Sequence, residues 1–335
     1  MSPSYKLIRG LAFWCLLLCM DGSLGFSQDA PQPQPAPGLS NQQVKPTAPA
    51  TPQSAPPPTS PSTDKPATKV IPAAAERHFH EAIVFEHDGN APNAIGEYKA
   101  AIKEYPDYFE AHYNLGRLYL DRQGYAEAIA ELQTAVNLRP DDANAHNNLG
   151  LALKHNRDIN GALAQYQQAV RLNPRLSSAQ NNLANVLYMK RDFNGAIEHY
   201  RAALALQSKG KLTDAERASL ADTHMNLGSV LDDAGRPDDA IAEYKEALAL
   251  QPRDAKAHYN LSIVYQKRKD MTSAISELRI AAKLAPDWPT PHIMLARLLK
   301  DSDPKAALDQ CIIADGLTED AKLHNLCGEL QKKTQ

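Results

Sequence analysis

Residues 109–142 read FEAHYNLGRLYLDRQGYAEAIAELQTAVNLRPDD, and residues 143–176 read ANAHNNLGLALKHNRDINGALAQYQQAVRLNPRL. Each stretch is 34 residues long, and the two share His, Asn, Leu and Gly at the same offsets in their first halves. Within each stretch apolar residues recur at i, i+3, i+4 and i+7, which predicts two amphipathic helices separated by a turn. A helix pair that repeats at a fixed period is typical of a stacked array.

The same period continues beyond these two stretches. Leucine recurs in the first half of six units, at Leu115, Leu149, Leu183, Leu227, Leu261 and Leu295. Glycine, alanine or, once, serine follows each of these leucines. Seven units lie near residues 75–108, 109–142, 143–176, 177–210, 221–254, 255–288 and 289–316. A ten-residue insertion, Lys211–Leu220, separates the fourth unit from the fifth, and Thr213 with Glu216 predicts a capping box that starts a lengthened helix there.

The pattern of Leu, Gly or Ala, Ala, a bulky residue, Ala and Pro resembles the tetratricopeptide repeat (TPR) family. The resemblance implies an all-α fold: a right-handed TPR superhelix, or α-solenoid, of about seven helix-turn-helix repeats. It also implies a concave groove that holds a peptide or protein segment. Residues 318–333 carry a single helical pattern with a charged remainder, which predicts a C-terminal capping helix.

The N-terminal residues predict a targeting segment followed by a linker. Lys6 and Arg9 precede the apolar run Leu11–Met20, and small residues follow, so residues 1–27 are expected to be a secretory signal peptide. The run rises only about 15 Å as a helix, half of a bilayer core, which disfavours the alternative of a permanent membrane anchor. A lipid-modified Cys19 is a second alternative, but Leu18 stands where lipoprotein signals need a small residue.

Residues 28–72 contain 13 of the 24 prolines. Proline fixes φ and donates no backbone hydrogen bond, so we expect a disordered Pro-rich linker here. A docking site for a proline-binding domain is the alternative. The TPR domain is predicted over residues 73–335.

Composition and motifs restrict the function. The net charge is −3, which argues against nucleic acid as a partner. No phosphate-binding glycine loop, nucleophile elbow, HExxH or CxxC motif occurs. We therefore expect a protein that is not an enzyme, with no catalytic residues, no cofactor, no metal and no small-molecule substrate. Membrane association is expected only through the N-terminal segment if it stays uncleaved.

Asparagine occupies one position, just before the leucine of the first helix, in five units. These residues are Asn114, Asn148, Asn182, Asn226 and Asn260. An asparagine amide can donate to a backbone carbonyl and accept from a backbone N–H at once. The row predicts a partner-binding ladder in the groove, similar to the ladder in the repeats of O-linked N-acetylglucosamine transferase, although no catalytic domain of that enzyme is present. The alternative is that these asparagines make local hydrogen bonds only.

Histidine recurs three residues after the start of six units, at His78, His112, His146, His224, His258 and His292, with Gln180 in the remaining unit. A metal ladder is disfavoured, because successive first helices are too far apart for their side chains to share one ion. We expect these residues to pack between helices. A minor hypothesis is that protonation of the imidazoles near pH 6 loosens the array.

Cys15 and Cys19 would leave with the signal peptide, whereas Cys311 and Cys327 remain. The TPR resemblance places the last two at facing positions, so a disulfide is possible in an oxidising compartment. Two buried thiols are the alternative.

Taken together, the sequence predicts an exported protein (periplasmic, cell-envelope or secreted). Its expected role is a non-catalytic protein–protein interaction scaffold that binds an extended peptide or protein segment in the concave groove. Two alternative roles are an assembly factor of a cell-envelope machine (pilus, secretion or outer-membrane complex) and a substrate-presenting subunit of a separate glycosyltransferase.

Overall fold

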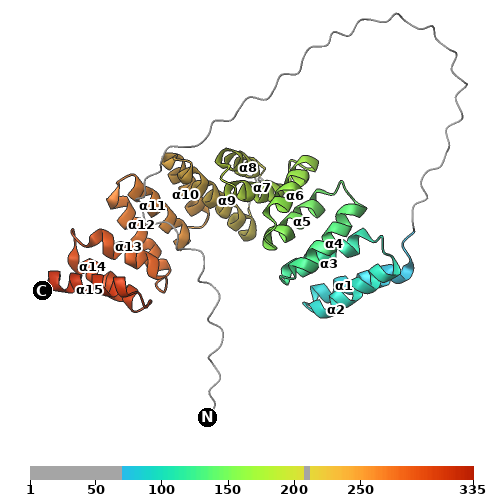
Figure 1. Ribbon diagram of the computed structural model, residues 1–335, viewed down its shortest axis with the longest axis horizontal. Coiled ribbons are helices and arrows are strands. Elements are labelled where there is room, and N and C mark those ends of the chain that lie inside the picture. Colours follow the sequence, from blue (N-terminus) through green and yellow to red (C-terminus); the bar gives the residue numbers. More distant parts are fainter. Residues whose placement is uncertain (1–69, 207–211) are drawn as a thin grey trace, which may run out of the picture. The chain divides into compact units, whose positions relative to one another are not determined.

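The computed structural model describes residues 70–206 and 212–335. The expected signal peptide and nearly all of the expected linker lie outside these described residues. The described part consists of fifteen α-helices, arranged as successive antiparallel pairs (Figure 1).

The first helix of each pair is called helix A and the second helix B. The A helices are α1 (Ala73–His87), α3 (Phe109–Asp121), α5 (Ala143–His155), α7 (Ser177–Met189), α9 (Asp214–Asp233), α11 (Ala255–Lys267) and α13 (Pro289–Leu299). The B helices are α2 (Ala91–Glu104), α4 (Tyr125–Leu138), α6 (Ile159–Leu172), α8 (Phe193–Ala205), α10 (Pro237–Leu250), α12 (Met271–Leu284) and α14 (Pro304–Asp315). Helix α15 (Ala321–Thr334) follows the last pair. Each helix packs against the next along the chain, which confirms the predicted all-α TPR array.

Aspartate side chains cap the first turn of several helices. Asp142 accepts a hydrogen bond from the Ala145 backbone N–H at 2.8 Å and so caps α5. Asp158 caps α6 in the same way, through the Gly161 N–H. Such caps satisfy backbone donors that the first turn of a helix leaves unpaired.

The turn from helix A to helix B needs one residue in the left-handed region. Gly89 (φ 73°) fills that place after α1, and Gly235 (φ 74°) fills it after α9. Gln123 adopts φ 62° after α3, although a glycine follows it directly. The turn geometry is therefore imposed by the packing of the two helices, and glycine is not required at every turn.

Helix A and helix B of a repeat approach most closely where helix A carries a small residue. A Cβ added to Gly150 would lie 2.8 Å from the Tyr166 ring, and one added to Gly228 would lie 2.9 Å from the Tyr244 ring. Both tyrosine side chains are buried. The bulky residue of helix B thus occupies the space that the small residue of helix A leaves free.

The insertion between the fourth and fifth repeats lengthens α9. Thr213 and Glu216 form the expected capping box, each side chain bonding to the other residue's backbone N–H. Helix α9 consequently begins seven residues before Ala221, where the repeat register resumes. Helix α8 ends at Ala205, and the Leu206 N–H bonds to the Ala203 carbonyl, which tightens its last turn.

A disulfide joins Cys311 on α14 to Cys327 on α15 across a sequence separation of 16. Leu323 and Leu330 of α15 are buried against the same cluster of apolar side chains as Cys311. The helix thereby covers the apolar end of the array. In the part of the chain that the structure describes, no helix combines the length and the apolar character needed to cross a membrane.

The substitution Gly150→Ala tests the close approach of helix A to helix B. We expect it to destabilise the protein by about 1–3 kcal/mol, because the new methyl group overlaps the Tyr166 ring. Gly96→Ala is the matched control, since a Cβ there meets no atom within 4 Å on α2. It should stabilise by about 0.5–1 kcal/mol through helix propensity. Equal effects in urea unfolding curves would contradict the packing argument.

Candidate functional site

The A helices line one face of the array. Successive A helices touch one another directly, as α3 does with α5, α5 with α7, α7 with α9, and α9 with α11. Successive B helices make no comparable contact in the described residues. The A helices therefore lie closer together and form what we call the inner face.

The predicted asparagine ladder lies at one position of the A helices, but its members differ in their contacts. Asn148 on α5 donates a hydrogen bond from Nδ2 to the Tyr113 hydroxyl on α3 at 3.0 Å. Asn182 on α7 donates to Oδ1 of Asn147 on α5, also at 3.0 Å. These two amides link neighbouring A helices, so each has one of its two N–H donors in use. The Asn148 oxygen also accepts a bond from Asn147 Nδ2 at 3.5 Å.

The other three ladder residues are less constrained. Asn114 is half-buried on α3, beside the Tyr98 hydroxyl. Asn226 on α9 is exposed and Asn260 on α11 is half-buried. Neither Asn226 nor Asn260 has a side-chain hydrogen bond to another described residue. Both retain the full hydrogen-bonding capacity of an amide.

The structure adds residues that the ladder prediction missed. Asn147 and Asn181 directly precede two ladder residues and share the 34-residue period. Asn181 donates to the Thr223 hydroxyl at 3.0 Å and so connects α7 to α9. Its own Oδ1 is buried without a hydrogen-bond partner. The repeated Asn-Asn pair was the sequence signal that could have revealed this asparagine-rich centre.

The recurring histidines connect helix A to helix B within a repeat. In six repeats the Nδ1 atom of this histidine lies 2.6–2.7 Å from a glutamate or glutamine oxygen on helix B. The fourth repeat exchanges the two partners, with Gln180 on helix A and His199 on helix B. The pairs are His78–Glu97, His112–Glu131, His146–Gln165, His199–Gln180, His224–Glu243, His258–Glu277 and His292–Gln310.

Some of these rings make a second bond. The Nε2 atom of His112 contacts the Pro106 carbonyl oxygen at 3.0 Å, and that of His146 contacts the Pro140 carbonyl at 3.0 Å. The side-chain amide of Gln180 donates to the Pro174 carbonyl in the same place. Each such residue therefore ties helix A to helix B and to the preceding loop, a role that glutamine can also perform.

In the first repeat Glu81 also approaches the pair. The ligand atoms of His78, Glu81 and Glu97 all lie within 4.8 Å of one another, a spacing that a divalent cation could bridge. The His78–Glu97 hydrogen bond is the same contact that recurs in the other repeats. Its presence is explained by helix pairing and needs no ion.

The surroundings of His258 shift its pKa. Burial by itself lowers the pKa of His258, but the hydrogen bond to Glu277, the Pro252 carbonyl and the nearby carboxylates together raise that pKa above its usual value. Protonation therefore strengthens this contact. For this residue the expectation that protonation loosens the array was wrong, because the ring faces a carboxylate and a carbonyl.

Comparison with protein families identifies the class. A profile described as TPR repeat matches residues 116–156, and four described as tetratricopeptide repeat match 97–130, 143–176, 175–253 and 225–289. Together they cover residues 97–289 without a gap, more than half of the chain. The chain is a tetratricopeptide repeat protein, and none of the matches is a catalytic domain. Proteins built from these repeats mediate protein–protein interactions.

Solved structures show the same fold at low identity. A Parabacteroides merdae tetratricopeptide repeat protein is 13% identical, with TM-score 0.55, covering 77% of this chain and 99% of its own. Pseudomonas aeruginosa PilF is 20% identical, with TM-score 0.54, covering 67% and 97%. A chain of the APC/C hetero-tetramer Cut9-Hcn1 is 23% identical, with TM-score 0.55 and coverage of 67%. The match spans less than half of that chain, at 43%. No curated protein matches in sequence.

The raised pKa of His258 gives a pH dependence with a defined sign. Because the folded-state pKa exceeds the unfolded value of about 6.5, the stabilisation is fully present below that value and is lost as pH rises through the folded pKa. We expect His258→Gln to lower the denaturation midpoint more at pH 6 than at pH 8.

His146→Gln is the matched control, since its ring faces the neutral amide of Gln165. It should lower the midpoint by similar amounts at both pH values. A larger effect of His258→Gln at pH 8 would show that the sign is wrong.

Proposed function

We propose that this protein is a non-catalytic scaffold that binds an extended polypeptide segment along the inner face of its A helices. The observation that carries the proposal is the row of asparagines, one per repeat, on five consecutive A helices. An extended peptide exposes N–H and C=O groups at regular intervals along its main chain. Amides at a regular spacing can bond these groups with little demand on the peptide's side chains.

The ladder residues have two tasks in this proposal. Asn148 and Asn182 stabilise the stacking of α3, α5 and α7 and have one N–H each in use, so they offer a ligand less hydrogen-bonding capacity. The side chains of Asn226 and Asn260 make no hydrogen bond to another described residue, so each can both donate and accept hydrogen bonds with a ligand. The affinity of a bound segment would therefore depend most on the C-terminal half of the ladder. The likeness to the ladder of O-linked N-acetylglucosamine transferase rests on the same asparagine position.

We further propose that the protein is exported, to the periplasm, the cell envelope or the medium. The order of charged, apolar and small residues in residues 1–27 supports a cleaved signal peptide. The Cys311–Cys327 disulfide agrees with an oxidising compartment. Protein purified from the native source should begin after Gly25 or Ser27 by N-terminal mass analysis, whereas an intact Met1 would overturn this part.

The substitution pair Asn226→Ala with Asn260→Ala tests the inner face. The probe is a peptide selected from a random dodecapeptide library on the immobilised full-length protein. We expect at least a tenfold loss of affinity, since each amide contributes about 1 kcal/mol through its hydrogen bonds. The melting temperature should stay unchanged, because neither side chain bonds to another described residue.

Gln167→Ala with Glu246→Ala is the matched control, because both are exposed residues of B helices. It should bind like the wild type. Failure to select any peptide, or equal binding by the Asn226/Asn260 variant, would contradict the proposal. The protein that carries the selected sequence would then distinguish a cell-envelope assembly factor from a subunit that serves a glycosyltransferase.

A further inference from the structure

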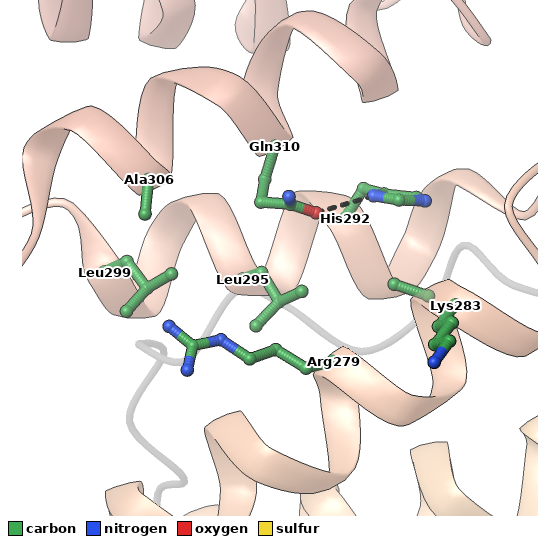
Figure 2. Close-up of a pocket in the computed structure, with 8 residues that line it drawn as sticks. Arg279, Lys283, His292, Leu295, Leu299, Ala306 and Gln310 are labelled. Carbon is green, nitrogen blue, oxygen red and sulfur yellow. Dashed lines mark hydrogen bonds between the residues drawn. The ribbon is translucent and has the colours of Figure 1, made fainter.

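A cavity is lined by residues of the B helices α12 and α14 and of the A helix α13. Its volume is about 250 Å³. Leu295 and Leu299 of α13 form its apolar floor, and Arg279 and Lys283 of α12 stand at one side (Figure 2). The cavity is separate from the asparagine ladder, which lies at another position of the A helices.

One residue that lines the cavity is smaller than its equivalents in the five preceding repeats. Ala282 is the cavity-lining residue at this position of α12. The equivalent positions of the five preceding B helices all carry a branched aliphatic residue: Ile102, Val136, Val170, Leu204 and Leu248. The sixth repeat therefore lacks, at this position, the branched aliphatic side chain that the five preceding repeats carry.

The two charged side chains that line the cavity, Arg279 and Lys283, are both positive. Arg279 and Lys283 lie one helical turn apart, and neither forms an ion pair with another described residue. Gln310 of α14 replaces the glutamate found at this position in four other repeats. Its oxygen is bonded to Nδ1 of His292 at 2.7 Å, which leaves its amide N–H group as a donor. No acidic residue lines the cavity.

We propose that this cavity binds a branched aliphatic carboxylate. The aliphatic group takes the place of the missing side chain above Ala282, against Leu295 and Leu299. The carboxylate lies beside Arg279 and Lys283, which have no ion-pair partner among the described residues and attract an anion. An uncharged ligand would gain nothing from the two cations, and an anion without an apolar body would leave the apolar floor uncovered.

Two sources share this chemistry: a free branched-chain acid, and the C-terminal residue of a polypeptide that ends in leucine or valine. The probes are 4-methylpentanoate for the first and N-acetyl-leucine for the second. The neutral control is 4-methylpentanamide, which has the same shape without the charge. Each is titrated into the full-length protein by isothermal titration calorimetry.

We expect saturable binding of at least one acid, with the amide at least tenfold weaker. Tighter binding of N-acetyl-leucine would indicate a polypeptide C-terminus, and tighter binding of 4-methylpentanoate would indicate a free acid. Equal binding of acid and amide, or no binding of either acid, would overturn the proposal.

Two variants locate the site. Ala282→Leu restores the residue that Leu248 provides one repeat earlier, so it should abolish binding and raise the melting temperature by about 2–4 °C. Arg279→Gln with Lys283→Gln should weaken acid binding at least tenfold without changing the fold, since both residues are exposed.

Lys245→Gln is the matched control, because Lys245 occupies the position of Arg279 one repeat earlier, where Leu248 fills the space. It should bind both acids like the wild type. Unchanged binding by the Arg279/Lys283 variant, or an equal loss in the Lys245 variant, would place the ligand elsewhere and refute the site. A failed peptide test on the inner face would leave these outcomes unaffected.

Discussion

The contact between a small residue of helix A and a bulky residue of helix B is the constraint on which the array depends. At Gly150 the Tyr166 ring occupies the position of the absent side chain, and at Gly228 the Tyr244 ring does the same. This contact sets the distance between the two helices of a repeat. Because the small and bulky positions recur with the repeat, successive helix pairs can stack in the same way.

A second contact fixes the rotation of the two helices. The hydrogen bond between the helix A histidine and a helix B glutamate or glutamine occurs in all seven repeats, with the partners exchanged at His199 and Gln180. In the fourth repeat the histidine lies on helix B and its partner on helix A, and the hydrogen bond between the two helices is kept. The geometry of the pair, rather than the presence of histidine on one helix, is what the fold requires.

Individual repeats depart from the common pattern at a few positions beside the two proposed sites. On the inner face, the Asn147 and Asn181 positions carry amides that bond between helices and surround the ladder. At the cavity between α12, α13 and α14, Ala282 stands where the five preceding repeats carry a branched aliphatic residue. A repeat protein can thus obtain a specific site without altering its core contacts.

The sequence by itself determined the helix pairs, their register and the position of the asparagine ladder, because a 34-residue period links each residue to one place on one helix. It also placed the start of α9, since the capping box at Thr213 is a local signal. Only the tertiary structure decided which asparagines bond to a neighbouring helix, that a carboxylate and a carbonyl raise the pKa of His258, and that Leu295 lines a cavity. These features depend on distances between side chains of different helices, and a period along the chain carries no information about those distances.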